Sequence, residues 1–161
     1  MDSPSVKTTE AGGERGFDGG KCINGRKRNV VVDTVGNLLA VIVNAANTDD
    51  RVGAKAAFAE LSSATIDALK KIWADGDYSG AKFLEWVTET LTATLEITYP
   101  PPNTYGFVVL PVRWVVERTL AWLGRYRRLS KDYEHCTKSS AGMIYAASIA
   151  TMLKRLVKNM R

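Results

Sequence analysis

The chain has 161 residues, 45 per cent of them hydrophobic, which fits one folded domain and excludes wholesale disorder. The longest late apolar stretch, residues 143–153, is too short to span a bilayer, and the N-terminus has no apolar signal core, so we expect a cytoplasmic protein. The net charge of +5 is uneven, because residues 1–110 sum to −3 and residues 111–161 to +8; this pattern indicates a polyanionic partner, nucleic acid before membrane.

The N-terminal 26 residues are mostly polar. A short strand is predicted at residues 2–7, and residues 9–26 are expected to form a mobile glycine-rich loop because they hold too few apolar side chains for a core element. The stretch GFDGGKC is similar to a phosphate-binding loop. We exclude that motif because Arg15 stands where it needs its first glycine and Cys22 where it needs Ser or Thr.

Residues 27–46, KRNVVVDTVGNLLAVIVNAA, carry the clearest strand signal. Two β-branched runs flank Gly36-Asn37, a dipeptide that favours a tight antiparallel hairpin turn. The second run, residues 38–43, is apolar throughout, as expected for a strand covered on both faces. Residues 47–61 predict a helix, and its early Asp49 and Asp50 suit the N-terminal cap. We interpret both of them, and Asp33, as structural.

The second half of the chain alternates strands and helices. We expect strands at residues 70–74 and 93–98, an extended segment at 107–110 after the prolines at 100–102, and helices at 81–91, from Pro111 onward and at 140–157. The last helix places one apolar stripe at Ile149, Met152, Leu153 and Leu156. Together the elements predict an α/β fold whose mixed sheet has antiparallel hairpin strands first and parallel strands later, flanked by helices.

Residues 112–131, VRWVVERTLAWLGRYRRLSK, form a basic helical segment with a single carboxylate, Glu117. At 100° per residue, Glu117 lies at the border of the apolar stripe, beside Gly124. An ion pair with Arg113, worth about 0.3–0.5 kcal/mol, is one explanation. The other is a metal ligand beside a polyanion.

Basic side chains in two regions are candidates for contacts with DNA phosphates, with a solvated or packed role as the alternative for each. Those of the helical segment are Arg113, Arg118, Arg125, Arg127, Arg128 and Lys131; those before the hairpin are Arg26, Lys27 and Arg28. For Trp114 we favour packing over stacking on a base.

Three carboxylates are candidates for a two-metal site that cuts phosphodiester bonds. Asp2 lies on the first strand, Asp75 at the C-terminal end of a later strand, and Glu117 on the basic helix. Mg²⁺ prefers oxygen ligands, so such a site needs neither His nor Cys. Asp77 is interpreted as a turn residue rather than a spare ligand. His135, Cys22 and Cys136 lack the further ligands that a zinc site requires.

Four segments carry a resemblance to a known family: DSPSVKT, GRKRNVVVDTVGNLLAVIVNAANTDDRVGA, IWADGDYSG and VVLPVRWVVERTLAWLGRYRRLSKDYE. They resemble the catalytic domain of bacterial insertion-sequence transposases, the DDE enzymes of the insertion-sequence-five type. The resemblance implies a ribonuclease-H-like domain over residues 1–157, followed by a basic tail at 158–161. The family's two aspartates and its glutamate fall on Asp2, Asp75 and Glu117.

The resemblance also implies an activity: cleavage of DNA at the ends of an insertion sequence and transfer of the freed strand to a target, with two Mg²⁺ or Mn²⁺ ions. The implied partners are DNA and either further copies of the chain or an N-terminal DNA-binding segment, with no membrane. The wider family often carries a signature of Tyr, Arg, Glu and Lys. Arg113 and Glu117 match it, whereas Leu110 and Gly124 replace Tyr and Lys, and Arg125 could supply the missing charge.

Family members carry a longer first strand and a DNA-binding region before it, so we expect this chain to be N-terminally truncated. A second hypothesis follows from that: an inactive truncated or second-frame transposase product that binds DNA or a full-length transposase. A ribonuclease-H-like nuclease with another substrate also remains open at this point.

Overall fold

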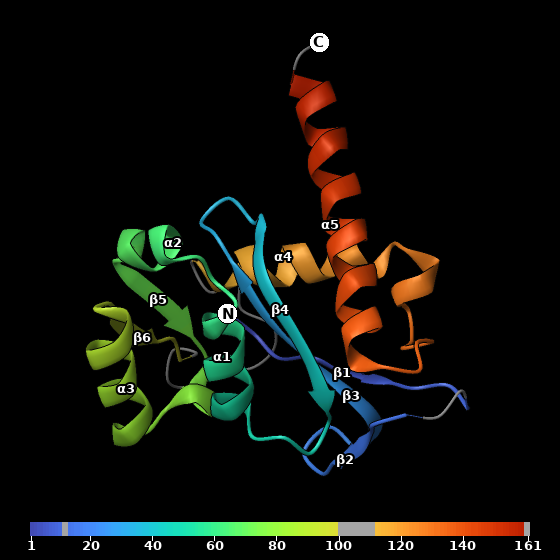
Figure 1. The fold of residues 1–161 in the computed structure, drawn as a ribbon, viewed down its shortest axis with the longest axis horizontal. Helices are drawn as coiled ribbons and strands as arrows, with labels where there is room; N and C mark the ends of the chain where they lie inside the picture. The colour runs from blue at the N-terminus through green and yellow to red at the C-terminus, as the bar shows by residue number, and fades with distance from the viewer. Residues whose placement is uncertain (11–12, 100–111, 160–161) are drawn as a thin grey trace.

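The computed structural model describes residues 1–10, 13–99 and 112–159. Its main sheet has four strands, β1 (Ser5–Lys7), β2 (Gly16–Asp18), β3 (Ile23–Val32) and β4 (Leu38–Ala45), and is drawn in blue to cyan in Figure 1. β3 is central and antiparallel to the other three. Asp2 extends β1 through a bridge to Val30. The strand predicted at residues 2–7 therefore forms in two pieces, interrupted where Pro4 has no amide hydrogen to donate.

Regular structure in residues 13–26 corrects the prediction that residues 9–26 form a loop. β2 pairs with the first residues of β3, and β3 begins at Ile23 rather than after residue 26. Gly25 lies between Lys7 of β1 and Gly16 of β2. A side chain at Gly25 would meet the backbone of Val6 at 1.9 Å, so the close strand approach needs a glycine there. Pairing with a long neighbouring strand, rather than apolar burial, holds this polar segment.

The β3–β4 hairpin is confirmed, with a longer turn than the dipeptide suggested. Asp33 organises the turn: its carboxylate accepts hydrogen bonds from the amides of Val35 and Asn37, at 2.9 and 2.8 Å. Gly36 has φ of 86°, a left-handed conformation that favours glycine, whereas Asn37 is not among the residues with positive φ. The interpretation of Asp33 as structural is thus confirmed.

A second, parallel sheet follows in the chain. It contains β5 (Lys71–Ala74) and β6 (Thr94–Ile97), joined by the short 3₁₀ helix η1 (Gly76–Tyr78) and by α3 (Ala81–Leu91). The predicted helix at 81–91 is confirmed residue for residue. Helix α2 (Ser63–Ala68) was not predicted. None of its residues is buried, so its sequence has no apolar side that would indicate a helix packed on the core. The expected segments at 100–102, 107–110 and Pro111 lie outside the described residues.

The two faces of the main sheet bury two separate cores, because neighbouring residues on a strand point to opposite sides. Val31 and Ala40 pack with α1 (Asp50–Ala59), α3 and the β5–β6 pair. Val30 and Val41 pack instead with α4 (Arg113–Gly124), the 3₁₀ helix η2 (Arg127–Leu129) and α5 (Thr137–Asn159). An α/β fold with an antiparallel sheet, a parallel strand pair and flanking helices is therefore confirmed.

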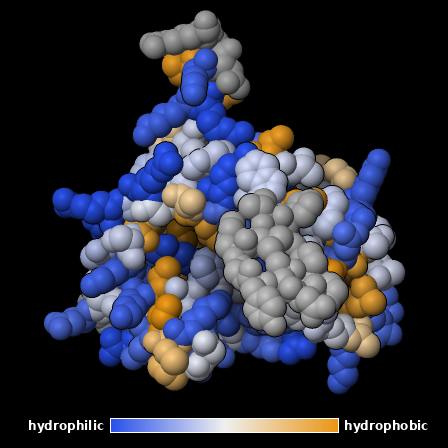
Figure 2. All heavy atoms as spheres, turned by 180° about the vertical axis from the view of Figure 1, so that it is seen from behind, coloured by the Kyte–Doolittle hydropathy of each residue, from blue (hydrophilic) through white to orange (hydrophobic). Residues whose placement is uncertain are grey.

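The second half of α5 projects beyond the sheet (Figure 1). Its predicted apolar stripe consequently faces outward: Ile149, Leu153 and Leu156 are more than half exposed. Figure 2, seen from behind, shows mainly hydrophilic side chains around this projecting end, with hydrophobic ones in small groups between them. None of the helices in the described part of the chain is long and apolar enough to cross a bilayer.

The N-terminus of α1 gives a test of local stability. Asp49 caps the helix by accepting a hydrogen bond from the amide of Arg51, as predicted, and the Arg51 side chain lowers the pKa of Asp49 to about 2. Asp49→Ala should lower the free energy of unfolding by about 1 kcal/mol at pH 7. Because the pKa is lower in the folded state, this contribution is complete above the unfolded value of about 4 and disappears as the pH falls through about 2.

Urea unfolding at pH 7 and near pH 2 measures this difference. Asp49→Asn is the matched control, since it keeps a capping oxygen without the charge and should lie between the wild type and the alanine variant at pH 7. An equal loss for Asp49→Ala at both pH values would contradict the assignment.

Candidate active site

Asp75 directly follows β5, at the point where the chain turns into η1. Its carboxylate Oδ1 accepts a hydrogen bond from the amide of Asp77 at 3.1 Å, and its side chain is 17 per cent exposed. Burial raises the pKa of Asp75, and the nearby carboxylate of Asp2 raises it further. The fold therefore brings two like charges, 73 positions apart in the sequence, close enough to repel each other.

A polar network holds the strand that carries Asp2. The amide of Ser3 donates to the carboxylate of Asp2 at 2.7 Å, and the hydroxyl of Ser3 donates to Asp50 at 2.7 Å. Lys27 of β3 also pairs with Asp50, at 2.7 Å. Asp50 thus connects β1 and β3 to α1, which confirms its structural role and ties the position of Asp2 to three elements.

Glu117 lies in the first half of α4 and shares an arginine with Asp75. Nε of Arg113 is 3.2 Å from Oε1 of Glu117, and Nη2 of Arg113 is 3.5 Å from Oδ2 of Asp75. The side chains are partly exposed: Arg113 by 31 per cent, Glu117 by 39 per cent and Asp75 by 17 per cent. The ion pair that offered the simpler explanation of Glu117 is therefore present, and the same guanidinium also links Glu117 to Asp75.

Asp75 thus lies near Asp2 and shares Arg113 with Glu117, but the three predicted carboxylates do not form a closed metal cage. Within residues 1–10, 13–99 and 112–159, no three Asp, Glu, His or Cys side chains are grouped closely enough to hold a metal ion. The positive charge between Asp75 and Glu117 is that of Arg113. A set of Asp and Glu oxygens nonetheless has the donor chemistry that Mg²⁺ prefers.

The family model for the transposase DDE domain matches residues 1–153, nearly the whole chain. The chain belongs to this family. Neither the curated proteins nor the solved structures give a match. Membership makes the chain a DDE transposase domain, a class of enzymes that act on DNA and generally use divalent metal ions.

The basic residues that the sequence placed before the hairpin lie within β3 and are buried in this transposase domain, which corrects the prediction that they contact DNA. Arg26 is fully buried, pairs with Asp132 at 3.1 Å and donates to the carbonyls of Glu14, Glu134 and His135. Lys27 is engaged with Asp50, and Arg28 donates to the carbonyls of Leu129 and Lys131. The cationic groups of all three serve interior contacts, so none of them is presented to DNA.

Arg118, another predicted phosphate contact, is also engaged with the protein. Its guanidinium lies 4.2 Å from the ring centre of Trp114 and 4.7 Å from that of Trp122, and it donates to the carbonyl of Val35 at 3.0 Å. The guanidinium of Arg155 in α5 lies 5.1 Å from the ring centre of Trp122 and donates a hydrogen bond to the same carbonyl, that of Val35. The spacing of Trp114, Arg118 and Trp122, four residues apart on one helix face, is the signal that could have revealed this stack.

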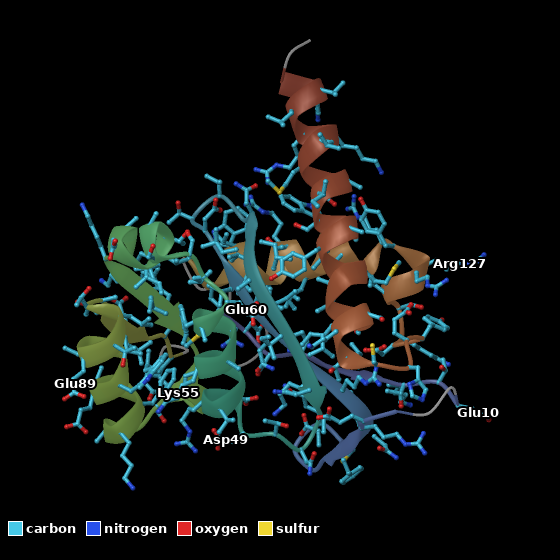
Figure 3. The ribbon with its side chains drawn as sticks, in the orientation of Figure 1. Glu10, Asp49, Lys55, Glu60, Glu89 and Arg127 are labelled. Atoms are coloured by element: carbon cyan, nitrogen blue, oxygen red, sulfur yellow. The ribbon has the colours of Figure 1, made fainter. Side chains whose placement is uncertain are left out.

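The remaining basic candidates of the transposase domain are exposed. They lie after the C-terminal end of α4 and are Arg125, Arg127, Arg128 and Lys131. Arg127 points away from the body of the molecule (Figure 3). Arg128 is 61 per cent exposed although it pairs with Glu134 at 2.9 Å. Glu117 and Arg125 are eight residues apart, so a rise of about 12 Å along the helix separates the carboxylates from this basic cluster.

Two contacts near the site escaped sequence reasoning. The link from Arg113 to Asp75 joins segments 38 residues apart, and no local pattern indicates it. Thr119 is buried and donates to the carbonyl of Gly36 at 2.9 Å, which fastens α4 to the hairpin turn. A side chain at Gly124 would meet nothing within 4 Å. Gly124 nevertheless lies seven residues beyond Glu117, a rise of about 10 Å along the helix, so it does not provide the room expected beside that carboxylate.

Proposed function

We propose that the chain is the catalytic domain of an insertion-sequence transposase of the insertion-sequence-five type, with a ribonuclease-H-like arrangement of its strands. It cleaves DNA at element ends and transfers the freed strand to a target. The observation that carries this proposal is that Arg113 forms ion pairs with both Asp75 and Glu117 while Asp2 lies near Asp75, in a chain of the DDE family.

Asp2, Asp75 and Glu117 would hold two Mg²⁺ or Mn²⁺ ions. When bound, the ions supply Lewis acidity to the attacking and leaving oxygens of the phosphodiester. The chain's own residues prepare the site for them. Asp2 and Asp75 concentrate negative charge in a partly buried place, and Arg113 balances that charge by pairing with Asp75 and Glu117. The partial exposure of Arg113 leaves it free to swing toward a DNA phosphate when cations replace its charge.

Arg125, Arg127, Arg128 and Lys131 would contact the DNA backbone. Such contacts orient the duplex without reading its sequence, so they leave recognition of the element ends to other surfaces. The partner is DNA, and a second copy of the chain or an N-terminal DNA-binding segment completes the assembly.

The test is cleavage of a labelled duplex that carries an element end, with Mg²⁺ and with EDTA. We expect nicking that needs Mg²⁺ and that disappears in Asp75→Asn, while the mobility shift of the bound DNA persists. Cleavage that survives in Asp75→Asn would contradict the assignment of this carboxylate. DNA binding without any Mg²⁺-dependent cleavage by the wild type would favour the alternative, a chain that binds DNA or a full-length transposase without catalysis.

A further inference from the structure

Arg28 is a buried cation without a carboxylate partner in the part of the chain that the structure describes. It lies in the middle of β3, it is 8 per cent exposed, and none of the ion pairs found there includes it. Burial lowers the pKa of Arg28, and the charge of Asp132, which pairs with Arg26, opposes that shift. Within residues 1–10, 13–99 and 112–159, its buried Nε atom has no hydrogen-bond partner. An apolar side chain would avoid the cost of burying this charge, so the arginine needs another explanation.

The hydrogen bonds that Arg28 does form both go to the basic segment after α4. Nη1 donates to the carbonyl of Leu129 at 2.9 Å, and Nη2 donates to the carbonyl of Lys131 at 3.3 Å. These carbonyls belong to the last residue of η2 and to the second residue beyond it, and no backbone amide of the described loops and turns donates to either. A planar guanidinium presents donors to two carbonyls at once, which the compact ammonium of a lysine does not. Arg28 therefore fixes how this segment lies against β3.

The same segment presents its charges outward. The side chain of Leu129 is buried in the core that includes α5, whereas those of Arg127, Arg128 and Lys131 are exposed. Arg127 points away from the body of the molecule (Figure 3). Inward-facing carbonyls thus hold a backbone whose basic side chains face solvent. A backbone that is already ordered loses less conformational entropy when its side chains bind a ligand.

We infer that Arg28 is a positioning residue for DNA binding: it holds residues 127–131 so that Arg127, Arg128 and Lys131 reach backbone phosphates together. Arg28 itself does not touch the duplex. The inference rests on the proposed function, in which these three side chains contact DNA. Without the two hydrogen bonds, the segment would take up more orientations, and fewer of them would bring all three charges to phosphates at once.

Two other roles of Arg28 would give different results. A purely structural role would change the stability of the domain and leave the DNA affinity of the folded protein unchanged. A role as a distant positive charge would be kept by a lysine, and it would not depend on the side chains of the segment. The positioning role predicts that DNA affinity falls, that lysine replaces arginine poorly, and that the loss depends on those side chains.

The test measures how tightly the full chain binds a fluorescein-labelled duplex, by anisotropy without Mg²⁺, at about 50 to 200 mM salt. Arg28→Met keeps a long unbranched side chain but removes both donors. We expect about tenfold weaker binding, with a slope of log affinity against log salt that is smaller by about 1–2, since each phosphate contact contributes about 0.9. Lys55→Met is the control for charge. It removes one positive charge from α1, far from Arg127 in Figure 3, and should change affinity less than about twofold.

A combined variant identifies the route of the effect. Arg127→Ala/Arg128→Ala/Lys131→Ala lacks the side chains that Arg28 positions, so adding Arg28→Met to it should weaken binding by less than about a further twofold. Arg28→Lys keeps the charge but not the two-pronged geometry, and we expect about fivefold weaker binding than for the wild type. Circular dichroism checks the fold of each variant. If Arg28→Met does not fold, Arg28→Lys replaces it in both backgrounds.

The outcomes separate this inference from the proposed function. An equal loss from Arg28→Met in the wild-type and the combined background would overturn the inference and leave the proposed DNA contacts standing. So would unchanged affinity of Arg28→Met beside a weakened combined variant. A wild type that does not bind the duplex, or a combined variant that binds as tightly as the wild type, would overturn the proposed contacts and the inference with them.

Discussion

Asp132→Ala should lower the free energy of unfolding by about 3–5 kcal/mol, the largest stability loss that we expect from one side chain here. Asp132 is 2 per cent exposed and its carboxylate pairs with Arg26, which is fully buried. Removing one partner of a buried ion pair leaves the other charge without compensation in a medium that solvates it poorly. The loss is a large share of the 5–15 kcal/mol typical of a domain.

The contacts of Asp132 explain why the loss should affect the whole fold. Its carboxylate also accepts hydrogen bonds from the amide of Glu134 and the hydroxyl of Ser140, at 3.1 and 2.5 Å. Its own backbone exchanges bonds with Lys7 and Thr9 beside β1. Asp132 therefore joins β1, β3 and the first turns of α5.

Urea unfolding followed by far-ultraviolet circular dichroism measures the effect. Glu96→Gln is the matched control: it breaks an ion pair with Lys71 in which the two side chains are 50 and 42 per cent exposed, and it should change stability far less than Asp132→Ala because water already solvates both charges. Ser140→Ala, which removes one hydrogen bond to the buried charge, should fall between the two. A value for Asp132→Ala as small as that for Glu96→Gln would show that Arg26 is not buried as described.

Glu117→Gln should reduce Mg²⁺-dependent cleavage of an element-end duplex by at least about 100-fold, with little change in DNA affinity. Glutamine keeps the size of the side chain but removes the negative charge that a hard divalent cation needs. Changes that only reorient metal ligands already lower activity about 10–100-fold, so the loss of a ligand charge should exceed that range. Phosphate contacts of the basic residues after α4 are unaffected, so the DNA should remain bound.

Single-turnover cleavage and a mobility-shift titration, on the same protein preparation, separate the two effects. Glu89→Gln is the control, because Glu89 is an exposed acidic residue on α3, away from α4 (Figure 3), and should cleave as the wild type does. The assignment of Glu117 as a metal ligand would be lost if its variant kept more than about a tenth of the wild-type rate. Equal losses of cleavage and of DNA affinity would indicate a role in binding instead.

Local patterns in the sequence determined most of the elements of this transposase domain. The β-branched runs around Gly36, the cap at Asp49 and the apolar periodicity of residues 81–91 each involve contacts between near neighbours in the chain. Contacts between near neighbours depend on the local sequence rather than on the rest of the fold, so β3, β4, α1 and α3 were predictable. The acidic positions at Asp2, Asp75 and Glu117 were also visible, as was the family.

Only the tertiary structure decided what the charged residues do. Arg26 and Arg127 are the same residue type in basic stretches, yet one is buried against Asp132 and the other points away from the body. Arg113 links Asp75 to Glu117, and the stripe of α5 faces outward because that helix outruns the sheet. Whether a charged side chain is buried in an ion pair or exposed to solvent depends on which distant segments the fold places beside it. The sequence does not show the distances between such segments.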